Sequence, residues 1–126
     1  MKEKERLWRT SKYEVLSHSE AIYREIQSNV NHQELVWVTA RIQEAKKKCP
    51  TIGTVTNAYE HMWGYFKKKA TDQEREETFH LLRQYQTGAI EVDHLWRHIA
   101  TLAINYDVTY IQESTLIAPY VKEEYE

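Results

Sequence analysis

The chain has 126 residues, of which 41% are hydrophobic and 29% are charged, and its formal net charge at pH 7 is −2. This length suits one domain with a substantial core, and the hydrophobic content excludes an intrinsically disordered chain. The only cysteine, Cys49, excludes an internal disulfide and a zinc-finger pattern. No apolar run is long enough to span a bilayer, and the charged N-terminus differs from a signal peptide. We therefore expect a cytoplasmic protein with no membrane partner.

Helix-breaking residues are scarce, because the chain contains three glycines and two prolines and no long alternation of apolar and polar residues. This composition predicts an all-α fold, a single-domain bundle of about six helices over residues 1–126. Ser19 and Asn31 are expected helix N-caps, Thr71 and Glu74 form a capping box, and Gly88 follows the fifth helix. The expected helices are residues 2–17, 20–29, 32–48, 54–69, 72–87 and 90–105, followed by a short turn or helix near 108–113 and an extended tail.

The fourth expected helix, residues 54–69, has two opposed faces at a helical period of about 100° per residue. The apolar face, which suits a core, contains Val55, Ala58, Tyr59, Met62 and Phe66. The opposite face contains Asn57, His61, Gly64 and Lys68, with Tyr65 beside them. An amide, an imidazole, a phenol and an ammonium group on one side of a helix are the groups that a ligand-binding surface needs. The alternative is that His61 and Tyr65 cap or pack against a neighbouring helix.

A glycine in the middle of this helix requires an explanation, because it costs about 1 kcal/mol relative to alanine. Gly64 suits a position where a ligand or another backbone approaches closely. We therefore expect Gly64 to be part of the candidate binding surface.

The charges are distributed unevenly along the chain. Residues 41–69 contain seven lysine or arginine side chains and two glutamates, whereas residues 107–126 contain five acidic side chains and one lysine. A basic region and an acidic tail suit a polyanionic partner. The alternative is that both lysine runs complement the dipoles of helix C-termini.

The evidence for an enzyme or a metal site is weak. His94 and His98 are separated by four residues, a metal-ligand spacing, but no third ligand is fixed by the sequence, so surface histidines are the simpler reading. His61 could act as a general base, but no nucleophile stands at a recognisable spacing. We therefore expect no cofactor, no metal and no assigned catalytic residue.

Several short motifs resemble the YbgA-like family, a group of bacterial domains long listed as uncharacterised, over about residues 5–121. The central motif is the most specific part, and Ser11, Ser114 and Val121 depart from the usual family pattern. The matching residues are Lys12-Tyr13, His18-Ser19, Asn57, His61, Gly64 to Lys68, Tyr85, Gly88, Tyr110-Ile111 and Pro119-Tyr120.

The resemblance implies a nucleic-acid-binding accessory domain, because this domain often occurs fused to a desulfidase-type domain that removes sulfur from thiolated pyrimidines. RNA, with tRNA as the favoured class, is then the expected partner, together with a desulfidase-type or other nucleic-acid-modifying enzyme. Lysines would neutralise phosphates, and tyrosine and histidine rings would stack on or hydrogen-bond bases. The expected RNA-binding residues are Lys12, Tyr13, Asn57, His61, Gly64, Tyr65, Lys67 and Lys68; Lys12 and Tyr13 are placed among them by the resemblance alone.

Two alternatives stay open. One is a small enzyme that acts on a nucleotide or modified base through His61. The other is a protein-interaction module that recruits a partner through an aromatic surface, and salt dependence separates this module from an RNA-binding domain.

Overall fold

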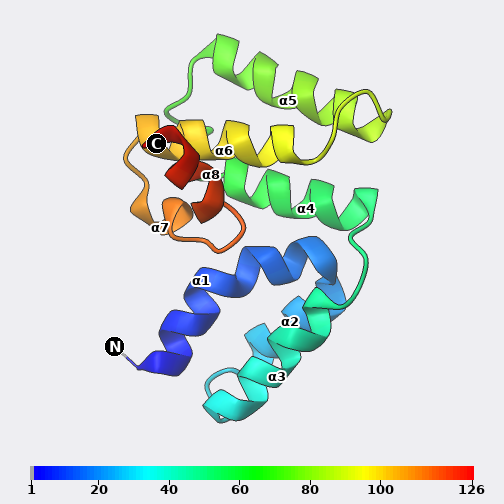
Figure 1. The fold of residues 1–126 in the computed structure, drawn as a ribbon, viewed down its shortest axis with the longest axis vertical. Helices are drawn as coiled ribbons and strands as arrows, with labels where there is room; N and C mark the ends of the chain where they lie inside the picture. Colours follow the sequence, from blue (N-terminus) through cyan, green and yellow to red (C-terminus); the bar gives the residue numbers. More distant parts are fainter. Residues whose placement is uncertain (1) are drawn as a thin grey trace. The chain divides into compact units, whose positions relative to one another are not determined.

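The computed structural model describes residues 2–126, and this part of the chain forms eight helices and no strand (Figure 1). The expected all-α fold is confirmed, but the number of helices is eight rather than about six. The helices are α1 (Glu3–His18), α2 (Glu20–Asn29), α3 (Leu35–Lys46), α4 (Ile52–Trp63), α5 (Asp72–Gln86), α6 (Asp93–Asn105), α7 (Thr109–Gln112) and α8 (Ala118–Glu124). Within residues 2–126, no helix combines the length and apolar character that a membrane crossing needs.

The chain divides into two compact units, Met1–Ala58 and Tyr59–Glu126, and the boundary falls within α4. Each unit is described by itself. The expected single domain over residues 1–126 stays a prediction.

The first unit contains α1, α2, α3 and the first part of α4, and α1 packs against both α2 and α3 (Figure 1). Its core arises from apolar residues at helical spacing on each element. Trp8 contributes most to one end of this core, since its ring contacts Tyr23 at a centroid distance of 5.7 Å and its indole Nε1 donates to Gln27 Oε1 at 2.9 Å. The buried core residues are Trp8, Val15, Ile22, Ile26, Val38, Ile42 and Ala45.

Local capping signals explain where the helices of this unit begin. Ser19 caps α2 as expected, because its Oγ accepts a hydrogen bond from the amide of Ile22 at 3.1 Å. The expected cap at Asn31 is wrong: α3 begins at Leu35, with Glu34 in the N-cap position and no side-chain cap bond. The intervening residues form turns, so the chain needs more residues to reverse between α2 and α3 than the capping signal suggested.

The second unit packs α5, α7 and α8 around α6. The apolar face predicted for the fourth helix is buried as expected: Val55 and Ala58 belong to the first unit, and Tyr59, Met62 and Phe66 belong to the second. Tyr59 links elements of the second unit, because its ring lies 6.4 Å from that of Trp96 and its hydroxyl donates to the carbonyl oxygen of Thr78 at 2.8 Å. The fully buried apolar residues include Tyr59, Met62, Phe66, Leu95, Ile99, Leu102, Ile111 and Ile117.

Two local signals in this unit are confirmed and one expectation is wrong. Thr71 and Glu74 form a reciprocal capping box at the start of α5, and Gly88 follows that helix with a φ of 84°. The tail is not extended, because it forms α8, in which Pro119 occupies the first turn. Proline suits that position because the amide it lacks has no partner within the helix.

Candidate functional site

Helix α4 ends at Trp63, so residues 64–69 form a turn rather than the last part of a helix. The amide of Gly64 donates to the carbonyl oxygens of both Glu60 and His61 at 3.2 Å, and the amide of Tyr65 donates to Met62 at 3.1 Å. Bonds that span three residues tighten the backbone relative to an α-helix. The prediction that Asn57, His61, Gly64 and Lys68 share one continuous helical face is therefore wrong.

This tightened backbone also explains Gly64. A Cβ atom at this position would lie 3.1 Å from the carbonyl oxygen of His61, which is closer than most Cβ contacts in proteins. The glycine thus relieves a tight contact within the turn, and no approaching ligand is needed to account for it. Sequence reasoning missed this because a glycine in the middle of a helix and one at its end look alike in a periodic pattern.

Contacts with Arg75 and Tyr106 fix the segment from Gly64 to Lys69, which we call the 64–69 turn. Phe66 is fully buried, and its ring lies 6.3 Å from that of Tyr106. The Arg75 guanidinium donates to the carbonyl oxygen of Lys67 at 2.9 Å. The Tyr106 hydroxyl donates its proton to Glu74 Oε1 at 2.5 Å, and its oxygen lies 3.4 Å from the carbonyl oxygen of Lys69. The 64–69 turn is therefore a surface segment with a defined backbone.

Basic and aromatic side chains project from the 64–69 turn. Tyr65 is 42% exposed, and its ring packs on that of Tyr110 in α7 with centroids 5.4 Å apart and planes inclined by 45°. Lys67, Lys68 and Lys69 are all exposed. Tyr110 was not among the expected binding residues, although its place in the late motif of the resemblance was a signal that could have included it.

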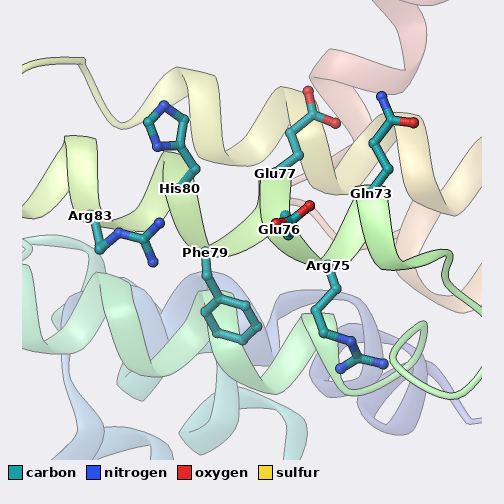
Figure 2. A pocket seen from close by; sticks show the side chains of 7 residues that line it. All are labelled: Gln73, Arg75, Glu76, Glu77, Phe79, His80 and Arg83. Atoms are coloured by element: carbon teal, nitrogen blue, oxygen red, sulfur yellow. The ribbon is translucent and has the colours of Figure 1, made fainter.

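Trp63, directly before this turn, is buried beneath two side chains of α5. The ring of Phe79 meets it edge-on at 6.0 Å, and the Arg75 guanidinium lies 5.7 Å from the ring centroid. Figure 2 shows Phe79 and Arg75 leaving α5 on one side, whereas Glu77 and His80 point the other way. Arg75 thus both covers Trp63 and holds Lys67, which couples the end of α4 to α5.

A shallow depression of about 700 Å³ runs along α5 (Figure 2). Its wall mixes two carboxylates and two guanidinium groups with one imidazole, so its charge favours neither an anion nor a cation. The residues that line it are Gln73, Arg75, Glu76, Glu77, Phe79, His80 and Arg83.

The remaining expected binding residues differ in exposure and in location. His61 is exposed in the last turn of α4 and belongs to the second unit with Gly64, Tyr65, Lys67 and Lys68. In the first unit, Lys12 and Asn57 are half-buried and Tyr13 is only 5% exposed. A ring this deeply buried offers little surface for base stacking. The grouping of these residues with the 64–69 turn stays a prediction.

The two spaced histidines are not a pair of surface residues. His94 is exposed, but the side chain of His98 is only 8% exposed and its Nε2 lies 2.7 Å from the Thr78 hydroxyl. Within residues 2–126, histidine, cysteine and acidic side chains do not gather in a group of three or more that could hold a metal ion.

The fold and this site define a small all-α protein with a fixed basic and aromatic surface turn. A family model described as a protein of unknown function, DUF1722, matches residues 12–121, and the chain belongs to this family. The matched range includes every expected binding residue from Lys12 to Lys68. No curated protein and no solved structure matches the chain.

Proposed function

We propose that this protein binds RNA, with tRNA as the first class to test, through the 64–69 turn and the Tyr65–Tyr110 pair. The observation that carries the proposal is a half-exposed aromatic pair on a turn with three exposed lysines. Lysines neutralise phosphates, and tyrosine rings stack on unpaired bases without regard to sequence.

The fixed backbone of the turn supports this role. Because Arg75 already holds the carbonyl oxygen of Lys67 and Phe66 is fully buried, binding does not have to order the main chain. Ordering a flexible segment opposes association, so a preformed turn favours affinity. His61, exposed one turn before Tyr65, would supply a hydrogen bond to a base or a phosphate.

The accessory role follows from the resemblance to domains fused to desulfidase-type enzymes. In this role the protein presents thiolated RNA to a desulfidase-type or other nucleic-acid-modifying enzyme. The two remaining candidates, an enzyme that uses His61 and a protein-interaction module, have no specific geometric support in the described residues.

Fluorescence anisotropy with total tRNA, thiolated and unthiolated, at two salt concentrations tests the proposal. We expect salt-sensitive binding that Tyr65→Ala weakens by about 1–3 kcal/mol and Tyr65→Phe weakens much less. Tyr125→Ala is the control, because Tyr125 is exposed on another element. Absence of salt-sensitive binding at micromolar protein, or equal losses for Tyr65→Ala and Tyr125→Ala, would refute the proposal.

A further inference from the structure

A second feature of the Tyr59–Glu126 unit lies apart from the 64–69 turn and begins at Thr78, which is fully buried. The Thr78 hydroxyl oxygen lies 2.8 Å from the carbonyl oxygen of Glu74 and 2.7 Å from Nε2 of His98. Both contacts are so short that each needs a proton between its two heavy atoms. The hydroxyl supplies one proton, to the carbonyl oxygen, which has none to give. The other proton must therefore reside on Nε2 of His98.

This proton count leaves a lone pair on Nδ1 of neutral His98. Within residues 2–126, Nδ1 makes no hydrogen bond, and its nearest charged neighbour is Glu77 Oε1 at 4.0 Å. That separation is too long for a direct hydrogen bond. When one ammonium nitrogen donates two hydrogen bonds of about 2.9 Å, its two acceptors lie roughly 4–5 Å apart. The 4.0 Å between Nδ1 of His98 and Oε1 of Glu77 therefore fits one ammonium nitrogen between them. The buried imidazole thus presents an acceptor to the same point as a carboxylate.

His98 and Glu77 both line an open cavity of about 390 Å³ formed by α5, α6 and α8. Three carboxylates line this cavity, those of Glu74, Glu77 and Glu124. The only guanidinium in the wall, that of Arg97, is already bound by Asp93 at 2.5 Å and by Glu123 at 3.1 Å. The three carboxylates therefore give the cavity a negative electrostatic potential, which favours a cation.

The cavity also has an apolar part. Leu81 and Leu102 line it beside His98 and Thr101. An organic cation with a short alkyl chain would place its chain against the leucines and its charge between Glu77 and His98. A metal ion fits less well, because one carboxylate and one imidazole at this spacing are too few ligands.

We propose that this cavity binds a small primary alkylammonium ion, whose nitrogen donates to Nδ1 of His98 and to the carboxylate of Glu77. The site is separate from the proposed RNA-binding turn, so either proposal can fail without the other.

Protonation of His98 competes with this ligand. A proton on Nδ1 turns this acceptor into a donor, which then bonds the carboxylate of Glu77. Neither Nδ1 nor this carboxylate is then available to the ligand. The charged or titratable groups that line the cavity with His98 are Glu74 and Glu77 from α5, His94 and Arg97 from α6 and Glu124 from α8. Binding should therefore be lost on acidification, although the ligand stays charged.

The test is a titration of the full chain with n-butylammonium, followed by NMR of ¹⁵N-labelled histidine rings at about pH 8, well above the reference pKa of histidine. The Nδ1 resonance of His98 should begin as an unprotonated nitrogen and shift on binding, whereas uncharged n-butanol should leave it unchanged. Glu77→Gln should weaken binding about tenfold, since it removes a charge-assisted hydrogen bond. The side chain of Glu77 is 60% exposed, so this change leaves the core intact.

Glu76→Gln is the matched control, because Glu76 is exposed, carries the same charge and leaves α5 in another direction (Figure 2). We expect it to leave affinity nearly unchanged. Equal losses for the two variants would mean that general charge attraction accounts for binding, and the site would be rejected. An Nδ1 that carries a proton at this pH, or no His98 shift at millimolar ligand, would reject it as well.

Discussion

Thr78 shows how one hydroxyl organises a set of buried polar groups. It accepts a hydrogen bond from His98 Nε2 and donates one to the carbonyl oxygen of Glu74, while its own carbonyl oxygen accepts one from the Tyr59 hydroxyl. Burial raises the pKa of Tyr59 far above its ordinary value, so this phenol stays a donor throughout the accessible pH range. Three helices are thereby connected through a residue with no exposed surface.

Thr78→Val should destabilise the protein by about 1–3 kcal/mol, because it keeps the shape of the side chain but leaves the buried Nε2 proton of His98 without an acceptor. Urea denaturation measures the effect. Thr101→Val is the matched control, since the exposed Thr101 hydroxyl bonds only the carbonyl oxygen of Arg97. If both variants lose the same stability, the contact between Thr78 and His98 contributes nothing.

His98 should also make stability depend on pH. Burial lowers its pKa in the folded protein, an effect that nearby Glu77 and Glu74 oppose. Between this lowered value and the unfolded value of about 6.5, the unfolded chain binds a proton that the folded protein does not. Stability should therefore begin to decrease on acidification below about pH 7.5, and the decrease should continue until His98 is protonated in the folded protein as well. Denaturation of His98→Gln should show a smaller decrease, whereas exposed His94→Gln should retain the full one.

At the scale of an element, the end of α4 determines where the candidate binding groups lie. A continuous helix would have aligned Lys68 with His61, but the tightened turn after Trp63 instead places Tyr65 on Tyr110. Gly64 relieves a tight contact in the turn, and Arg75 and buried Phe66 hold it.

Gly64→Ala should destabilise the protein by about 1 kcal/mol, because the new Cβ would press on the carbonyl oxygen of His61, which the helix backbone holds in place. Gly53→Ala provides the opposite case. A Cβ at Gly53, in the first turn of α4, would meet only Thr51 Oγ1 at an ordinary 3.7 Å. We expect it to stabilise the protein by about 0.4–1 kcal/mol. Thermal unfolding of both variants should give shifts of opposite sign, and shifts of the same sign would contradict this account of the turn.

Features that depend only on neighbouring residues could be predicted from the sequence. Ser19 and Thr71 cap their helices because an N-cap depends on three or four adjacent positions. The buried face of α4 could likewise be predicted from the helical periodicity of its apolar residues. Pro119 carried a usable signal for α8, since proline favours the first turn of a helix. The short, charged tail concealed that signal.

The remaining features depend on contacts between distant segments. In the sequence, His98 falls on the polar face of α6. Its contact with Thr78 of α5 cannot be predicted from that pattern. Tyr65 meets Tyr110, and nothing in the local pattern of either residue predicts the other. The sequence therefore indicated candidate residues for a site but not how those residues are arranged.

At the scale of the whole molecule, the two lysine runs fall in different compact units. Residues 46–48 lie at the end of α3 in the first unit, and residues 67–69 lie in the second. The backbone around the first run is also fixed, because the carbonyl oxygen of Lys48 contacts Nδ1 of His18 at 2.7 Å. The two runs have the same length and charge, and the second stands beside the half-exposed Tyr65–Tyr110 pair.

Replacing all three lysines of residues 67–69 by alanine should reduce the slope of log affinity for tRNA against log salt by about two units, as expected for the loss of three contacts to single-stranded phosphates. The same replacement at residues 46–48 should leave the slope nearly unchanged. Anisotropy titrations over a range of salt measure both slopes. Equal reductions would indicate that the RNA follows net charge rather than this turn.

The fixed backbone of the 64–69 turn has a consequence for amide exchange with deuterated solvent. Its side chains are largely exposed, yet the amides of Phe66, Lys69 and Ala70 all donate to carbonyl oxygens at 2.8–2.9 Å. Exchange requires these bonds to open, and opening would have to disturb buried Phe66. Mass spectrometry should therefore find slow deuterium uptake here, slower than in the exposed tail beyond α8. The protein would thus carry a surface whose chemistry faces solvent while its backbone behaves like part of the core.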